Sequence, residues 1–220
     1  MTRQQPADTR RQAILDAATL LLVDSGLRGT SVDAVARSAG IAKGTVYLYF
    51  ASRSDLLAAL RSRYAEDLAS RAESILKRAK PRDVSSVARA FQRLAAELLD
   101  HMLASQRLYH VLFQEAGVSE EETMAPLRHL VLDTLRQAME QGALRPMDPD
   151  VLMRFLLDGL HGAMLPLFHE SRQDRRRVQA GLNEIIRRVL APAAPTRPQS
   201  PSPTSPAAPA AVPGRSHRTS

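Results

Sequence analysis

Residues 39–50 read AGIAKGTVYLYF, and this stretch decides how the rest of the chain is interpreted. Its last four positions hold two tyrosines and a phenylalanine, although the whole chain has only four tyrosines and five phenylalanines. A buried position would favour leucine or isoleucine, because a tyrosine hydroxyl needs a hydrogen-bond partner once it is buried. The concentration of aromatic side chains therefore indicates that part of this stretch is a contact surface.

The stretch lies within a predicted pair of short helices joined by a tight turn. Thr30 opens a helix that ends near Ala39, and a second helix is expected over residues 42–49. Gly40 permits the positive φ that a sharp turn between them needs. Residues 31–53 are therefore interpreted as a helix-turn-helix, whose second helix is too short and too polar to be a core helix.

The outward side of that second helix has the chemistry of a nucleic-acid surface. Lys43 lies at its N-terminus, where free backbone N–H groups and the helix dipole attract a phosphate. Gly44 lets the backbone approach DNA closely, and Thr45 and Tyr47 offer hydroxyl groups and an apolar ring face. Phe50 is expected to face inward and hold this surface to the core.

The net charge of +7 is spread unevenly along the chain. Residues 1–64 contain nine Lys or Arg and five Asp or Glu, whereas residues 65–190 contain eighteen of each. A basic N-terminal segment on a neutral body is typical of a polyanion partner for that segment. Arg10 and Arg11, at the start of the first predicted helix, are read either as solvated or as contacts to flanking phosphates.

Composition excludes several classes of protein. The chain has no cysteine, so disulfides, thiolate metal sites and cysteine nucleophiles are ruled out. The N-terminus has no apolar segment typical of a signal peptide. Asp16 interrupts the apolar run AILDAATLLLV, so no membrane span is predicted. We expect a soluble, cytoplasmic protein without a membrane partner.

Catalytic and metal-binding patterns are missing from the sequence. The six histidines form no i,i+3 or i,i+4 pair, so no metal site is predicted. There is no Gly-rich phosphate loop and no G-x-S-x-G motif, and no cofactor or catalytic residue is expected. An enzyme and a helical adaptor that does not bind DNA remain the alternative classes, which salt-dependent, sequence-specific DNA binding would exclude.

The rest of the chain shows helical periodicity, so the fold class is all-α. A long helix is predicted from Ser52 to about Ala79, and five more helices follow Pro81. Asp148 followed by a proline is a strong start signal for one of them. Residues 192–220 are rich in Pro, Ala, Ser and Thr and are interpreted as a disordered tail.

The run TSVDAVARSAGIAKGTVYLYFASRSDLL, residues 30–57, resembles the DNA-binding signature of TetR-type transcriptional regulators. The resemblance is specific over residues 9–70 and architectural beyond them. Ala42 stands where the family often has serine, and Arg53-Ser54 stands where it usually has Lys-Glu. The matching residues are Thr30, Ala39, Gly40, Gly44, Thr45, Tyr47, Tyr49, Phe50 and Arg53.

This resemblance implies a helix-turn-helix domain over residues 9–70, joined by the long fourth helix to an effector-binding and dimerisation domain over residues 71–191. It implies a repressor that binds a palindromic operator as a homodimer, with activation and co-repressor dependence as alternatives. Tyr49 is either a core anchor or a base contact, and Arg53 is either a phosphate contact or solvated. The DNA-binding residues it implies are Thr30, Ser31, Lys43, Gly44, Thr45, Tyr47, Tyr49 and Arg53.

Two further sets of residues are expected in the second domain. Small and apolar residues of the last two helices predict an intersubunit four-helix bundle, formed by Gly159, Gly162, Ala163, Val178, Leu182, Ile185 and Ile186. A second set either lines an effector cavity or simply packs in the core, and comprises Phe91, Met102, Tyr109, Phe113, Phe155 and Phe168. The few polar groups predict a neutral or weakly polar, hydrophobic effector.

Overall fold

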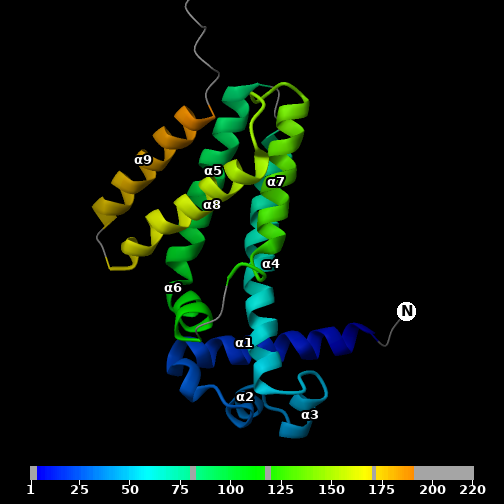
Figure 1. Ribbon diagram of the computed structural model, residues 1–220. Coiled ribbons are helices and arrows are strands. Elements are labelled where there is room, and N and C mark those ends of the chain that lie inside the picture. Colours follow the sequence, from blue (N-terminus) through cyan, green and yellow to red (C-terminus); the bar gives the residue numbers. More distant parts are fainter. Residues whose placement is uncertain (1–3, 80–82, 117–119, 170–171, 191–220) are drawn as a thin grey trace, which may run out of the picture.

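The computed structural model describes residues 4–79, 83–116, 120–169 and 172–190. Within these ranges the chain is helical and forms no strand, which confirms the all-α prediction. Three helices lie at one end of the molecule, and the long helix α4 rises from them into a second group of helices (Figure 1). The predicted tail, residues 192–220, lies outside the described residues.

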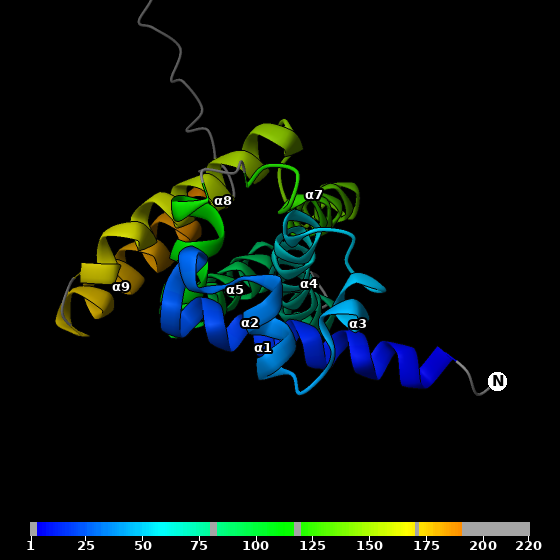
Figure 2. The same ribbon diagram turned by 90° about the horizontal axis from the view of Figure 1, so that it is seen from below.

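The N-terminal unit consists of α1 (Gln4–Gly29), α2 (Val32–Ser38) and α3 (Lys43–Tyr47), and Figure 2 shows this unit from below, with α1 lying across the view. The apolar side chains on the inward faces of the three helices pack together and form its core. The backbone leaves helical geometry at Gly26, whose φ is 64°, a conformation that glycine adopts readily. Buried members of this core are Ile14, Leu15, Ala18, Leu22, Val35 and Val46.

Helix α4 (Arg53–Ala79) belongs to both halves of the molecule. Ser52 caps it, since its Oγ accepts from the Asp55 N–H at 3.1 Å, in agreement with the predicted start. The first turns bury Leu56 and Leu60 in the N-terminal unit, and later turns bury Leu76 in the body. Helix α4 is therefore packed into both halves of the molecule.

The body packs α5 (Val84–Ala104) and α7 (Ala125–Glu140) against α4. After α6 (Gln106–Tyr109) the chain widens into a π-helix, η1 (His110–Glu115). The wider turn lets three consecutive side chains, Val111, Leu112 and Phe113, all be buried.

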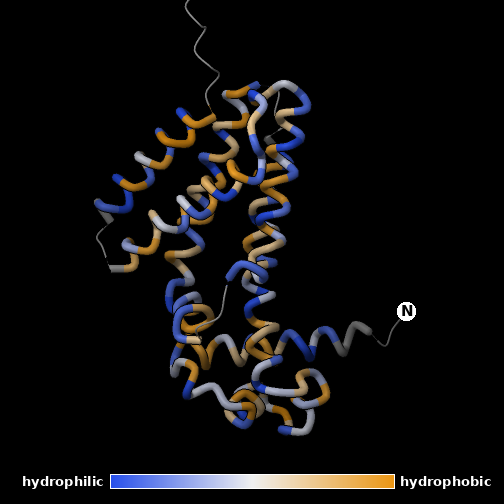
Figure 3. The backbone as a smooth tube through the Cα atoms, viewed as in Figure 1, coloured by the Kyte–Doolittle hydropathy of each residue, from blue (hydrophilic) through white to orange (hydrophobic). Residues whose placement is uncertain are grey.

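The last two helices form one side of the body and leave apolar side chains uncovered. They are α8 (Pro149–Met164), extended by the 3-10 turn η2 (Leu165–His169), and α9 (Arg172–Val189). Residues 149–168 are long and apolar enough to span a membrane by length and composition, although such a match is weak evidence. No such segment was predicted from the sequence. Only 28% of that window is buried within the chain, so the rest of the chain only partly covers this apolar helix (Figure 3).

The start of α8 tests how much one cap stabilises this fold. The Asp148 carboxylate accepts from the Asp150 N–H at 2.9 Å and the Val151 N–H at 3.1 Å. We expect Asp148→Ala to lower the free energy of unfolding by about 1 kcal/mol, because two N–H groups lose their acceptor. Asp148→Asn, which keeps the acceptor oxygen, is the control and should lose much less in denaturant unfolding. Equal losses in the two variants would contradict the capping role.

Candidate nucleic-acid interface and internal cavities

Helices α2 and α3 are joined by a turn whose geometry the sequence dictates. Ser31 caps α2, since its Oγ accepts from the Ala34 N–H at 3.1 Å. The turn passes through Gly40 at a φ of 66°, and the Ile41 N–H donates to the Ala36 carbonyl at 3.0 Å. These contacts fix the angle at which α3 leaves α2.

Helix α3 turns one side to the core and the other to solvent. Val46 is fully buried and Phe50 nearly so, and the Arg11 guanidinium lies 5.3 Å from the centre of the Phe50 ring. Tyr49 is half-buried against the core, which supports its reading as an anchor rather than a base contact. The inward positions therefore agree with the prediction and hold α3 in place.

The outward side of α3 is open. Tyr47 is 46% exposed, and a side chain built at Gly44 would meet no atom within 4 Å. Lys43 extends from the N-terminus of the helix, where its Nζ lies 3.0 Å from the Asp33 carboxylate. That hydrogen bond, followed by the charge of Asp33, raises the pKa of Lys43. The ammonium group is therefore charged, and a phosphate must compete with Asp33 for it.

Two predicted DNA contacts lie elsewhere. Thr30 is buried and its hydroxyl donates to the Gly26 carbonyl at 2.9 Å, so its side chain cannot reach DNA. Arg53 donates from Nε to the Thr30 carbonyl at 2.7 Å and from Nη2 to the Leu27 carbonyl. Both residues hold the connection between α1 and α2 together. The prediction was wrong for the Thr30 side chain. Arg53 uses its guanidinium group to bind backbone carbonyls of the segment between α1 and α2.

Sequence reasoning missed Leu48, which is 82% exposed at the end of α3. Leu48 lies between Tyr47 and Tyr49 in the sequence, and no pattern distinguished it from a core leucine. Its exposed side chain adds an apolar surface beside Tyr47. Apolar side chains can recognise the thymine methyl group in the major groove. Ser31 and Thr45 complete this face, although the Ser31 hydroxyl oxygen also caps α2.

The body contains a pocket of about 90 Å³, here called the effector cavity, which lies between α4, α5, α7 and α8 and is partly open to solvent. Most of its wall is apolar, and a smaller part is formed by polar and charged side chains. The mostly apolar wall agrees with the expectation of few polar groups, although that expectation did not include charged side chains in the lining. Its lining residues are Tyr64, Leu68, Leu98, Met102, Tyr109, Glu120, Met124, Leu127, Arg128, Leu157, Asp158, Leu160, His161 and Met164.

The polar part of the effector cavity is a hydrogen-bonded cluster. The Tyr109 hydroxyl donates to the Glu120 carboxylate, and the His161 Nε2 lies 2.8 Å from the same hydroxyl. Burial, followed by Glu120, raises the pKa of Tyr109. Across the cavity Arg128 pairs with Asp158 at 2.6 Å, while its Nε is buried without a hydrogen-bond partner among the described residues. A ligand with an acceptor group would satisfy that N–H.

The predicted effector-binding residues divide into three groups. Met102 and Tyr109 line the effector cavity. Phe113 and Phe168 pack against the Tyr109 ring, with centroid distances of 5.3 and 5.9 Å, and do not line it. Phe91 and Phe155 line a different groove, so the prediction was wrong for these two. Aromatic content alone did not distinguish a cavity wall from the packing behind it.

That second groove, of about 140 Å³, lies between α5, α8 and α9 and contains most of the predicted dimer residues. Phe155 is 55% and Ile185 49% exposed, whereas Leu182 and Ile186 are buried within the chain. Side chains built at Gly159 and Gly162 would meet nothing within 4 Å, so both glycines face open space. Ala163 lines the groove and Val178 packs against the core.

Known proteins resemble both halves of the chain. Residues 14–60 match the model of the tetR family of bacterial regulatory proteins. The transcriptional repressor KstR2 of Mycobacterium tuberculosis (strain CDC 1551 / Oshkosh) is 28% identical over 163 residues, which cover 69% of this chain and 78% of the relative. The transcriptional activator FasR of Mycolicibacterium smegmatis is 27% identical over 123 residues, covering 56% and 54%.

A solved structure matches the whole architecture. The regulator FadR of Bacillus subtilis, determined in complex with stearoyl-CoA, superposes with a TM-score of 0.60 over 81% of this chain and 96% of its own, at 17% identity. At that identity the likeness concerns the fold alone. The family match, however, covers the helix-turn-helix and the start of α4. It therefore includes α3 and its outward face. Residues 14–60, which form most of the N-terminal unit and the first turns of α4, therefore match the tetR family of bacterial regulatory proteins.

Proposed function

We propose that the protein is a transcriptional regulator that binds a palindromic operator as a homodimer and is released from it by a small-molecule effector. The observation that carries this proposal is the outward face of α3. A five-residue helix anchored by Val46 and Phe50 presents Lys43, Gly44 and Tyr47 to solvent. A helix in this position fits the major groove of B-DNA. The proposal includes a cytoplasmic location and no catalytic role.

The proposed contacts divide by chemistry. Lys43 takes a phosphate oxygen, with Gly44 allowing the backbone close to the strand. Thr45, Tyr47 and the exposed Leu48 face the bases. Ser31 at the start of α2 completes the phosphate contacts, whereas Tyr49 and Arg53 support the helices that carry them.

The dimer is proposed to form through α8 and α9. A single α3 reads only a few base pairs, so specificity requires two copies on a two-fold symmetric site. The exposed Phe155 and Ile185 and the open faces of Gly159 and Gly162 supply an apolar surface where two backbones can approach closely. A second copy of the same helix pair would cover it as a four-helix bundle.

The effector is proposed to be an amphipathic molecule with an apolar body and a hydrogen-bond acceptor. The apolar wall of the effector cavity suits the body, and the unpartnered Arg128 N–H suits the acceptor. The stearoyl-CoA bound to the FadR of similar fold is a molecule of this kind. Repression is favoured by the likeness to KstR2, and activation is the second candidate because FasR is named an activator.

The DNA-binding surface is tested by comparing two substitutions on α3. Lys43→Ala should weaken binding to every DNA sequence and reduce the slope of log affinity against log salt by about one, because one phosphate contact is lost. Tyr47→Ala should weaken operator binding by about 1–3 kcal/mol and leave non-specific binding nearly unchanged. Fluorescence anisotropy at several salt concentrations measures both. If Tyr47→Ala unfolds the domain and spares operator binding, Tyr47 belongs to the core.

The dimer interface is tested at side chains that the single chain leaves exposed. Ile185→Asp and Phe155→Asp should give monomers in sedimentation velocity with unchanged helicity, because neither residue is needed for the core of one chain. Leu20→Asp is the matched control, since Leu20 is 63% exposed on α1, outside the groove. Dimers that persist in both groove variants would place the interface elsewhere.

The effector prediction uses a panel of fatty acids and acyl-CoA thioesters of different chain lengths. A member that binds should raise the melting temperature of the free dimer and lower its operator affinity. To change the ratio of the DNA-binding to the non-binding conformation from 99:1 to 1:99, the effector must bind the second conformation more tightly by about 5.5 kcal/mol. Arg128→Gln should weaken binding of that compound roughly tenfold, since a charged donor is lost. A compound that tightens operator binding instead would make the protein a co-repressor-dependent regulator.

A further inference from the structure

A second cavity lies on the other side of one wall of the effector cavity. It has a volume of about 300 Å³ and lies between α1, α4, α5, α6 and η1, where the N-terminal unit meets the body. We call it the junction cavity. Its lining residues are Thr19, Leu60, Arg63, Tyr64, Asp67, His101, Ser105, Leu108 and Leu112. Tyr64 is the one residue in the linings of both cavities.

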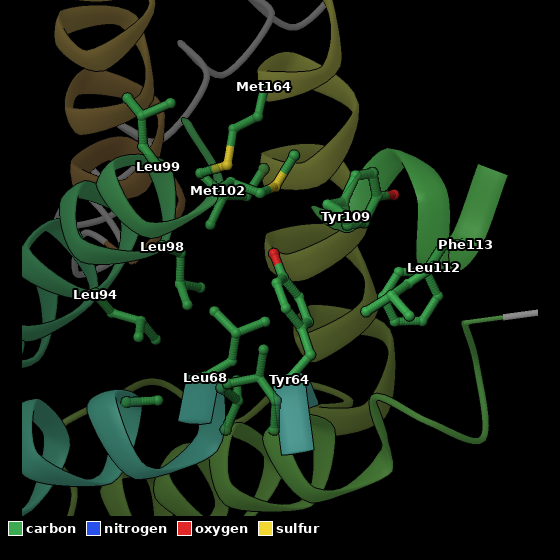
Figure 4. Close-up of a cluster of buried hydrophobic side chains, with 14 of the residues drawn as sticks. Tyr64, Leu68, Leu94, Leu98, Leu99, Met102, Tyr109, Leu112, Phe113 and Met164 are labelled. Carbon is green, nitrogen blue, oxygen red and sulfur yellow. The ribbon is translucent and has the colours of Figure 1, made fainter. Parts of the chain in front are cut away.

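The Tyr64 ring forms the partition between the two cavities. Figure 4 shows it projecting from α4 into the apolar cluster, with Leu98 of the effector cavity on one side and Leu112 of the junction cavity on the other. Its centroid lies 5.3 Å from that of His101, 5.7 Å from Phe113 and 6.2 Å from Tyr109. The hydroxyl lies 3.2 Å from the Ser105 Oγ.

Ser105 determines the direction of that bond. Its hydroxyl donates to the His101 carbonyl at 2.7 Å, so its oxygen accepts the proton of Tyr64. Burial, the largest cause, raises the pKa of Tyr64 to about 12, which keeps the phenol protonated and able to donate. One hydrogen bond and ring packing therefore hold Tyr64 where it is.

The neighbour of Tyr64 on α4 holds the N-terminal unit. Arg63 donates from Nη1 to the Asp16 carboxylate at 2.6 Å and from Nη2 to the Leu15 carbonyl at 3.2 Å and the Thr19 hydroxyl. All three acceptors are on α1. Two adjacent residues of α4 thus have different contacts: Tyr64 lines the effector cavity, and Arg63 binds α1, against which α2 packs.

We propose that Tyr64 and Arg63 form the link through which an occupied effector cavity changes DNA binding: the ligand displaces the Tyr64 ring toward the junction cavity, and Arg63 transmits the shift of α4 to α1. This rests on the proposed function. A close-packed side chain moves only where free volume lies beside it, and the junction cavity provides that volume behind Tyr64. His101, whose ring centroid lies 5.3 Å from that of Tyr64, lines the same cavity.

The test fills the effector cavity covalently in the folded protein. The natural chain has no cysteine, so Met124→Cys introduces a single thiol at a half-buried position that lines the effector cavity and not the junction cavity. Benzyl methanethiosulfonate attaches a benzylthio group to it, and dithiothreitol removes the group. We expect labelling to weaken operator affinity about tenfold and dithiothreitol to restore it. Glu140→Cys, at an exposed position on the same helix, is the labelled control and should not respond.

Two double variants, each of which adds one substitution to Met124→Cys, test whether the effect of the label passes through Tyr64 and the junction cavity. The first double variant, Met124→Cys with Tyr64→Leu, lacks the aromatic ring that the label would displace. The second, Met124→Cys with Leu108→Trp, fills the junction cavity into which that ring would move. Labelling should then change operator affinity less than twofold in either background, as a double-mutant cycle requires. If one background fails to fold by circular dichroism, the other decides.

The possible outcomes distinguish a failure of the Tyr64 link from a failure of the proposed DNA-binding function. If the unmodified protein selects no operator, the proposed function fails. If it binds an operator, complete labelling by mass spectrometry without loss of affinity overturns the Tyr64 link. An equal loss of affinity in the Tyr64→Leu or Leu108→Trp background also overturns it, because the signal then bypasses the partition.

Discussion

The burial of Val46 and Phe50 is the constraint on which the rest of the structure depends. Helix α3 has only five residues, and a helix of that length is not stable in water by itself. Val46 in the helix and Phe50 just after it are almost completely buried against the N-terminal core, and we infer that this burial stabilises the helix and fixes its orientation. Lys43, Gly44, Tyr47 and Leu48 are presented to a partner only because these anchors hold.

The same core fixes α4, and α4 connects the two halves of the molecule. Its 27 residues span about 40 Å at 1.5 Å per residue. Leu56 and Leu60 belong to the N-terminal core, and Tyr64 lies at the partition between the two cavities. A rigid helix with both attachments gives a physical route between a ligand and the DNA-binding surface. No separate hinge is needed for that coupling.

Most of the fold could be predicted from the sequence, because helix signals are local. The caps at Ser52 and Asp148 and the positive-φ turn at Gly40 each act within a few residues and were read correctly. The capping residue of α2 was misplaced by one, since Ser31 caps it and Thr30 is buried. The π-helix η1 was not predicted, because the need to bury Val111 through Phe113 comes from distant neighbours.

The candidate sites were harder to predict because they depend on long-range contacts. Arg53 reaches carbonyls more than twenty residues away, which no local pattern reveals. The polar part of the effector cavity brings together Tyr109, Glu120 and His161 from three segments. Aromatic residues were easy to select in the sequence, but only packing separates a cavity wall such as Tyr109 from the Phe113 behind it.

The central claim is that two copies of α3 read DNA in a symmetric pair. Selection of bound duplexes from a random pool, followed by sequencing, tests it most directly. The account predicts enrichment of an inverted repeat whose half-site centres lie about one helical turn, or a multiple of it, apart. Enrichment of a single asymmetric motif would contradict the dimeric mode of reading. A pool that remains random after repeated selection at moderate salt would contradict sequence-specific binding altogether.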